Sequence, residues 1–138
     1  MVEIRLMDWE RARAHAAPIR FEVFVREQRV PEEIELDEMD PRSIHAVAFG
    51  DGKPVGTGRL LPDGHIGRMA VLRDWRRKGV GALLLQDLMS KAKDQGHREI
   101  VLSAQVHAVP FYLRHGFERE GPVYEEAGIA HQAMRRAL

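Results

Sequence analysis

The apolar positions of this chain repeat with two different periods, and each period predicts a different kind of element. Alternating apolar and charged residues at the start, and short apolar runs further on, predict strands. Two gaps between these runs are Asp-Gly dipeptides, at 51–52 and 63–64, which are typical of hairpin turns and predict a three-stranded antiparallel meander. The strands expected in this part of the chain are residues 2–6, 44–49, 55–61 and 65–72.

A helical period follows the first strand. Asp8 is placed to cap a helix that begins at Trp9, and Pro18 is expected to divide this helix in two or to kink it. The second part covers residues 19–28 and ends before Val30-Pro31. Its apolar face is expected to consist of Phe21, Phe24 and Val25.

A third helical stripe covers residues 82–92 and ends at Gly96, and a short buried strand follows at 100–102. A strand, a helix and a strand in this order predict a parallel pair of strands. A short helix at 108–115 and two closing strands, from 117 onward and at 129–134, complete the chain. The sum predicts an α+β fold with a mixed, mostly antiparallel sheet of six to seven strands flanked by helices.

Composition narrows the class of protein. The 138 residues suit a single domain spanning 1–138. The 21 basic residues balance the 21 acidic ones, and this zero net charge argues against a nucleic-acid binder that relies on bulk positive charge. The chain has no cysteine, and its seven histidines lack metal-ligand spacing, so we expect no metal. Without a signal-peptide core or an apolar run of membrane-spanning length, we expect a cytoplasmic protein that binds no membrane.

The most specific motif reads RRKGVG at positions 76–81, between the expected strand at 65–72 and the expected helix at 82–92. Glycines let the backbone approach an anion, and a helix start offers free N–H groups and the positive end of the helix dipole. The pattern R-x-x-G-x-G differs from the phosphate loop of nucleoside triphosphatases and from the dinucleotide-binding turn. A basic turn at the start of a surface helix is the simpler interpretation, but the strand and helix on either side favour phosphate binding.

A second motif, AVPFYLRHGF at 108–117, follows the first after one helix and one strand. Alone, it is better explained by core aromatics, Phe111 and Tyr112, with a hydrogen-bonded hydroxyl, but its spacing from the first motif reverses this preference. Together the two motifs resemble the acetyl-coenzyme A pyrophosphate loop and the A-x-x-F-Y-x-x-x-G-F signature of the GCN5-related N-acetyltransferases (GNAT). Residues 20–40 and 124–134 are similar to a bacterial ElaA/YjcF-like branch of that family, so the resemblance covers nearly the whole chain.

This resemblance implies a GNAT fold, in which the central strand splays from the next parallel strand and the pantetheine arm of acetyl-coenzyme A lies in the gap. Many members have asparagine where this chain has Gln105, so the pantetheine contact would come from a longer side chain here. Pro110 suits the first helical turn, where its missing N–H has no partner. The residues implied to bind the coenzyme are Met69, Ala70, Val71, Arg76, Arg77, Lys78, Gly79, Val80, Gly81, Ala82, Gln105, Phe111 and Tyr112.

The resemblance also implies direct attack of an amine on the acetyl thioester, with Tyr112 returning a proton to the departing sulfur. A phenol suits this step as a neutral donor at pH 7. The candidate bases for the amine are Glu27, Glu126 and His131, each with a structural alternative as an ion pair or a hydrogen-bonding group. The acidic segment 32–40 either attracts a cationic amine or forms a solvated face. The apolar anchors expected in that segment are Ile34, Leu36 and Met39.

We therefore expect an N-acetyltransferase, monomeric or homodimeric, that moves an acetyl group from acetyl-coenzyme A to a primary amine of a small-molecule acceptor. Two alternatives remain. The RLLP run at 59–62 and the E-x-D-x-x-D pattern at 35–40 are also similar to acyl-homoserine lactone synthases, which use an acyl-carrier protein. The other alternative is a non-catalytic coenzyme A-binding sensor module, which the intact Tyr112 disfavours.

Overall fold

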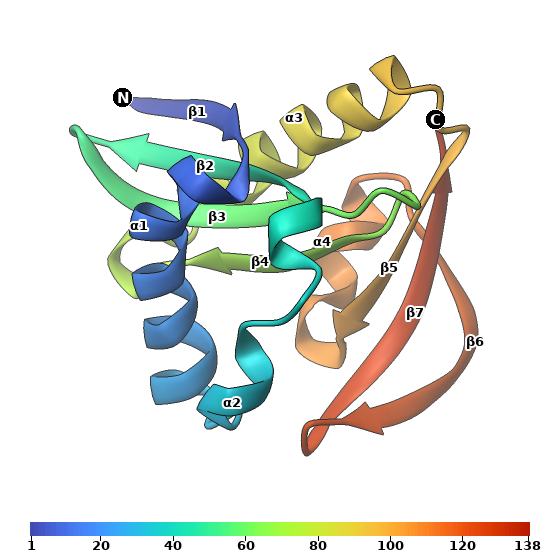
Figure 1. The fold of residues 1–138 in the computed structure, drawn as a ribbon. Helices are drawn as coiled ribbons and strands as arrows, with labels where there is room; N and C mark the ends of the chain where they lie inside the picture. Colours follow the sequence, from blue (N-terminus) through green and yellow to red (C-terminus); the bar gives the residue numbers. More distant parts are fainter.

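The computed structural model describes the backbone of residues 1–138 and every side chain except that of Ile34. Seven strands form two sheets, with the orders β1-β2-β3-β4 and β5-β7-β6 (Figure 1). The strands are β1 (Val2–Met7), β2 (Ile44–Gly50), β3 (Lys53–Leu60), β4 (Ile66–Val71), β5 (Glu99–Gln105), β6 (Glu118–Glu126) and β7 (Ile129–Ala137). The helices are α1 (Trp9–Arg20), α2 (Glu32–Glu35), α3 (Val80–Asp94), α4 (Val109–Arg114), the π-helix η1 (Phe21–Glu27) and the 3-10 turns η2 (Asp40–Arg42), η3 (Arg73–Trp75) and η4 (Val106–Ala108).

The two sheets meet at the N-terminal ends of β4 and β5, which are parallel to each other there. The only β-bridge between them in the described chain joins His65 to Val101, and the Val101 N–H lies 3.5 Å from the Gly64 carbonyl. Beyond this point the strands diverge, and Figure 1 shows the three-stranded sheet turning away from the four-stranded one. The predicted α+β fold with a splayed parallel pair is therefore confirmed, with seven strands.

The predicted meander is also confirmed. Strands β2, β3 and β4 pair in an antiparallel manner, within a few residues of the expected bounds. Asp51 and Gly52 have φ values of 52° and 80°, as a type I′ hairpin turn requires at both central positions. The sequence pattern placed these strands well because each turn carries its own local chemistry.

Two consecutive helical segments are present, as expected, but the boundary between them does not lie at Pro18. Pro18 lies inside α1, which runs to Arg20 and continues directly as η1 from Phe21. A proline removes one backbone donor, and the packing of α1 against β2 and β3 outweighs that loss. The change of helix type comes three residues later, at the end of α1.

The apolar face predicted for residues 19–28, which consists of Phe21, Phe24 and Val25, is only partly correct. The residues from Phe21 to Glu27 form a π-helix, whose side-chain positions differ from those of an α-helix. The Gln28 N–H donates to the Val23 carbonyl at 3.1 Å, five residues back. This wider turn rotates successive side chains away from the positions that an α-helix gives them. Phe21 is consequently 39% exposed and Val25 only half-buried. The buried residues of this segment are Ile19, Val23 and Phe24.

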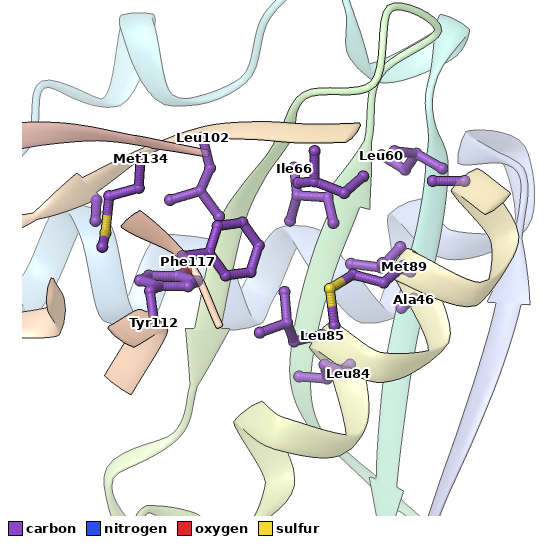
Figure 2. Packing of buried hydrophobic residues seen from close by; sticks show 14 of the residues in the cluster. Ala46, Leu60, Ile66, Leu84, Leu85, Met89, Leu102, Tyr112, Phe117 and Met134 are labelled. Carbon is purple, nitrogen blue, oxygen red and sulfur yellow. The ribbon is translucent and has the colours of Figure 1, made fainter. Parts of the chain in front are cut away.

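One continuous apolar core joins the two sheets. Leu84, Leu85 and Leu88 of α3 are fully buried in it, as the helical stripe predicted. Figure 2 shows Leu84 and Leu85 among their neighbours. A Cβ at Gly56 of β3 would lie 3.1 Å from Leu84, so glycine at this position lets α3 approach the sheet closely. The C-terminal half contributes to the same cluster. Its members there include Leu102, Tyr112, Phe117 and Met134.

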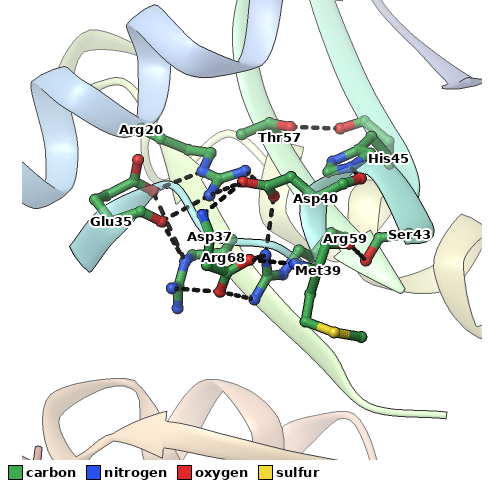
Figure 3. Close-up of polar contacts among 11 residues, drawn as sticks. Arg20, Glu35, Asp37, Met39, Asp40, Ser43, His45, Thr57, Arg59 and Arg68 are labelled. Atoms are coloured by element: carbon green, nitrogen blue, oxygen red, sulfur yellow. Dashed lines mark hydrogen bonds and ion pairs between the residues drawn. The ribbon is translucent and has the colours of Figure 1, made fainter. Parts of the chain in front are cut away.

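The acidic segment 32–40 is not a solvated face throughout, and of its expected apolar anchors Met39 is half-buried, whereas the side chain of Ile34 lies outside the described residues. It starts with α2, Leu36 is 42% exposed, and Glu35 and Asp40 are buried. The carboxylates of Glu35, Asp37 and Asp40 pair with three arginines from other elements (Figure 3). The arginines are Arg20 of α1, Arg59 of β3 and Arg68 of β4.

The shortest contacts of this network are made by Arg20 and Arg59. Arg20 donates to Glu35 Oε1 at 2.6 Å and to Asp40 Oδ1 at 2.7 Å. Arg59 donates to Asp37 Oδ1 at 2.7 Å and to Asp40 Oδ1 at 2.9 Å. Because unpaired buried charges are strongly unfavourable, these six groups hold α1, the 32–40 segment and the sheet in one arrangement.

Candidate active site

A cavity of about 960 Å³ lies at the gap between β4 and β5. It is bordered by β4, the C-terminal end of β5, η1 and the turn between β6 and β7. Nine of the predicted site residues line this cavity: Glu27, Met69, Ala70, Val71, Arg76, Gln105, Tyr112, Glu126 and His131. The remaining predicted coenzyme contacts do not line it: Arg77, Lys78, Gly79, Val80, Gly81, Ala82 and Phe111.

Of these residues, 77–79 form the loop that leads from the cavity to α3, 80–82 form the first turn of α3, and Phe111 lies on α4. Gly79 is the N-cap and has a φ of +81°, and Arg77 also has a positive φ, of 64°. The first hydrogen bond into the helix runs from the Leu83 N–H to the Gly79 carbonyl at 3.1 Å. Residues 76–79 form a turn, but among the described residues no main-chain N–H from 77 to 82 donates a hydrogen bond of good distance and angle to another main-chain group. Six amides are thus available for an anion at the positive end of α3.

The ring of Phe111 packs against the main chain at Gly81, in the first turn of α3. A Cβ at Gly81 would lie 3.5 Å from the Phe111 ring, which is ordinary van der Waals contact. The ring also packs edge-on against Tyr112, with centroids 5.0 Å apart. The two motifs found in the sequence therefore meet in space, and Phe111 links the loop to Tyr112.

The exposed edge of β4 provides main-chain groups to the cavity. The Leu72 N–H bonds to the Val55 carbonyl of β3 at 2.9 Å, so the preceding N–H, that of Val71, points to the opposite side, toward β5. The Val71 carbonyl accepts a hydrogen bond from Arg76 Nε at 2.8 Å. The Val71 N–H is thus a donor available to an oxygen atom bound in the cavity.

Arg76 also holds Glu27. Its Nη2 donates to Glu27 Oε1 at 2.8 Å, and Arg73 lies 3.6 Å from the other carboxylate oxygen. The hydrogen bond from Arg76 lowers the pKa of Glu27, against the opposing effect of burial, and the charges of Arg76 and Arg73 add to this lowering. A carboxylate with a lowered pKa is a weaker base, so the geometry favours Glu27 as the group that orients these two arginines.

Tyr112 of α4 is 7% exposed and lies between Phe111 and Phe117. Burial raises the pKa of its hydroxyl to about 12. The phenol consequently stays protonated at neutral pH and serves as a hydrogen-bond donor.

His131 of β7 has a fixed tautomer. Its Nδ1 lies 2.7 Å from the Ile129 carbonyl oxygen, which can only accept, so Nδ1 carries the proton in the neutral ring. The lone pair is then on Nε2. The ring stacks on Tyr124, with centroids 5.9 Å apart, and is only 9% exposed. The hydrogen bond at Nδ1 therefore leaves Nε2 of the neutral His131 ring as a possible proton acceptor.

Two features of the cavity were missed by the sequence interpretation. Gln105 exchanges two hydrogen bonds with Gln28 of the segment after η1, at 2.7 and 3.0 Å. The hydroxyls of Ser103 and Tyr124 are also hydrogen-bonded. Gln28 lies in the stretch 20–40 that carries the family resemblance, and nothing in the sequence signals that its amide pairs with a residue 77 positions away.

The described residues contain no group of three or more His, Asp or Glu side chains placed to hold a metal ion. Among the helices of the same residues, none is long and apolar enough to cross a membrane.

A splayed strand pair beside a helix with free N-terminal amides defines the class of fold that binds an acyl-coenzyme A, and comparisons with known proteins agree. Residues 11–138 match the family model described as an acetyltransferase (GNAT) domain. The chain is 42% identical to the N-acetyltransferase YjcF of Bacillus subtilis (strain 168) over 125 residues, covering 86% of this chain and 87% of YjcF. The protein therefore belongs to the GNAT family of acyltransferases, whose acyl donors are coenzyme A thioesters.

Solved structures give the same result. The crystal structure of Escherichia coli ElaA superimposes with a TM-score of 0.86 at 27% identity, covering 99% of each chain. An acyl-CoA N-acyltransferase from Pseudomonas aeruginosa superimposes with a TM-score of 0.87 at 30% identity, covering 99% of this chain and all of its own. The predicted relationship to the ElaA/YjcF-like branch is confirmed.

Proposed function

We propose that this protein transfers an acetyl group from acetyl-coenzyme A to a primary amine of a small acceptor, by direct attack within the single domain 1–138. The observation that carries this proposal is the row of six main-chain N–H groups at 77–82, without main-chain hydrogen-bond partners, directly after the cavity-lining Arg76. Such a row suits a diphosphate, because each N–H can donate a charge-assisted hydrogen bond. The positively charged side chains of Arg77 and Lys78 add to the attraction.

The pantetheine arm would follow the open edge of β4, along Met69, Ala70 and Val71. Gln105, the amide that the family resemblance assigns to this arm, is bonded to Gln28 in this structure. The Gln28 amide has the same donor and acceptor groups as a pantetheine amide, so the coenzyme can replace Gln28 at Gln105 without leaving either group of Gln105 unpaired.

Proton transfers are assigned to His131 and Tyr112. The neutral Nε2 of His131 takes a proton from the amine, whose nitrogen attacks the thioester carbon. The Val71 N–H stabilises the resulting oxyanion. The carbon–sulfur bond breaks, and the departing sulfur takes the proton of the Tyr112 hydroxyl. The second proton that the nitrogen loses on becoming an amide restores the Tyr112 hydroxyl, and the proton on His131 passes to solvent. The products are an N-acetyl amine, free coenzyme A and one proton released to solvent.

Binding of acetyl-coenzyme A tests the loop and cavity directly. A ligand that binds only the folded state raises the melting temperature, and a concentration of about 100 times the Kd is expected to raise it by roughly 8 °C or more. Differential scanning fluorimetry with acetyl-coenzyme A measures this shift. An unchanged melting temperature at millimolar ligand would contradict both the transferase and the sensor proposals.

Tyr112→Phe is expected to lower kcat by about 10- to 100-fold, because the departing thiolate loses its hydrogen-bond donor. Coenzyme affinity should stay within about twofold of the original, since the ring and its packing remain. Thiol release measures kcat and isothermal titration calorimetry measures affinity. An unchanged kcat would remove Tyr112 from the mechanism, whereas a loss of affinity would make its role structural.

The same thiol-release assay separates an enzyme from a coenzyme-binding sensor. The resemblance to acyl-homoserine lactone synthases depended on Arg59 and on the acidic residues at 35–40. These residues form the buried ion-pair network, which gives them a structural role in either kind of enzyme.

A further inference from the structure

The cavity has different charge at its two ends. At the end next to the glycine loop, Arg73 and Arg76 share a single carboxylate, that of Glu27. Two guanidinium groups against one carboxylate leave an excess of one positive charge there. This excess suits the phosphates of a coenzyme.

The middle of the cavity is electrically balanced. Arg59 and Arg68 line it, and both belong to the ion-pair network of three arginines and three carboxylates. Burial lowers the pKa of Arg68, and the neighbouring charges of Arg59 and Arg20 lower it further, while Asp37 and Glu35 oppose them. An acceptor carboxylate placed here would have to compete with Asp37 and Glu35 for guanidinium groups that are already paired.

At the other end lies the turn between β6 and β7, where Glu126 lines the cavity. Among the described residues Glu126 has no ion-pair partner, whereas every arginine that lines the cavity is paired with a carboxylate. No lysine is among the described residues that line the cavity. The acceptor end therefore has an excess of negative charge and no free cation.

Glu126 and His131 lie on the same face of this hairpin. Tyr124 pairs with His131, and Glu126 pairs with Ile129, two residues before His131. Side chains two positions apart on a strand share a face, so Glu126 and His131 are diagonal neighbours, with Cα atoms about 7–8 Å apart. The stacking of Tyr124 on His131 is consistent with this arrangement. Both side chains line the cavity, so an ammonium group bound there can contact the carboxylate and the imidazole.

We propose that the acceptor is a cationic primary amine without a carboxylate or phosphate near its amino group, and that Glu126 binds its ammonium form. This inference rests on the proposed function. It gives Glu126 and His131, both of which the sequence offered as bases, two different roles. Glu126 binds the ammonium group by charge, and His131 Nε2 then accepts one proton from it. The neutral amine attacks the thioester carbon, and the bond to sulfur breaks.

Matched acceptors test the substrate class. Phenethylamine and phenylalanine differ by one carboxylate next to the amino group, and so do butylamine and norvaline. The carboxylate-free member of each pair is expected to have a kcat/KM higher by about tenfold or more, because the carboxylate is repelled by Glu126 and finds no unpaired cation. Thiol release from acetyl-coenzyme A measures each value. Equal values within both pairs would overturn this inference alone, whereas release with none of the four compounds and no other amine would overturn the proposed transferase function itself.

Glu126→Gln tests the residue assignment. It should raise KM for phenethylamine by about three- to tenfold and weaken the salt dependence of KM, while kcat at saturating amine stays within about twofold. Glu125→Gln is the matched control, because Glu125 is exposed on the opposite face of the same strand and does not line the cavity. Equal KM values for the two variants would overturn the assignment, and so would a large fall in kcat for Glu126→Gln, which would make Glu126 the base.

Discussion

Asp40→Ala is expected to lower the free energy of unfolding by about 3–5 kcal/mol. Asp40 is 1% exposed and accepts hydrogen bonds from two arginines, Arg20 and Arg59, and from the Asp37 main chain. Removing its carboxylate leaves positive charge buried without compensation, which costs more than the favourable pair contributed.

Urea denaturation measures this loss, with Glu38→Ala as the matched control. Glu38 is exposed in the same segment and makes no ion pair with the described residues, so its removal should change stability by less than about 0.5 kcal/mol. If the Asp40 variant does not fold, Asp37→Ala keeps the test available: Asp37 is 31% exposed, and about 1–2 kcal/mol is expected. A loss as small as that of the control at both positions would mean that the network does not stabilise the fold.

The same network predicts sensitivity to acid. Burial raises the pKa of Asp40, but hydrogen bonds and charge from Arg20, together with those from the Asp37 main chain and Arg59, outweigh it and hold the pKa below its usual range. A lowered folded-state pKa contributes stability that is present above the ordinary aspartate pKa and is lost as pH falls through the folded value. The unfolding free energy of the original protein should therefore fall more steeply below about pH 4 than that of Asp40→Ala.

The elements that the sequence predicted well are those defined by local chemistry. Gly52 and Gly96 have positive φ values at the turn and at the helix end where they were expected. The motif at 76–81 was correctly placed between a strand and a helix, because glycines and a helix start act within a few residues. The apolar stripe of α3 is likewise a local repeat and was found in the core.

What the sequence did not reveal depends on contacts between distant residues. The charges of Arg20 and Asp40 are visible in the sequence, but their burial follows from how α1 packs against β3 and β4. The π-helical turn at 21–27 has the composition of an α-helix, and only its hydrogen bonds distinguish it. The Gln28–Gln105 pair joins η1's end to β5 across the cavity, so it exists only once both sheets are in place.

These differences change the interpretation of the acidic residues more than that of the coenzyme loop. Before the structure, the segment at 32–40 was a candidate for attracting an amine. Glu35, Asp37 and Asp40 are paired to arginines, so our proposal gives this task to Glu126, a carboxylate without an ion-pair partner among the described residues. The charge of the acceptor end is therefore set by the β6–β7 turn, whereas the ion-pair network sets the shape of the opposite wall.

Gly79→Val is expected to weaken acetyl-coenzyme A binding by about 100-fold or more. Gly79 has a φ of +81°, which a β-branched residue adopts only with strain, so the loop must shift and the six amides at 77–82 lose their alignment. A Cβ at this position has nothing of the protein within 4 Å. The added methyl groups would therefore occupy open space beside the amides, where the diphosphate is proposed to lie.

Gly96→Val is the matched control for this experiment. Gly79 precedes α3, and Gly96 follows it at the opposite end of the helix. Gly96 also has a positive φ, +89°, and likewise has no protein atom within 4 Å of its missing Cβ. Both variants should lose a similar amount of stability, about 1–2 kcal/mol, while only Gly79→Val loses the coenzyme. Urea denaturation and calorimetric titration measure the two quantities on the same samples. Full coenzyme affinity in Gly79→Val would mean that the diphosphate is bound elsewhere, and an equal loss of affinity in both variants would trace the effect to the helix as a whole, not to its amides.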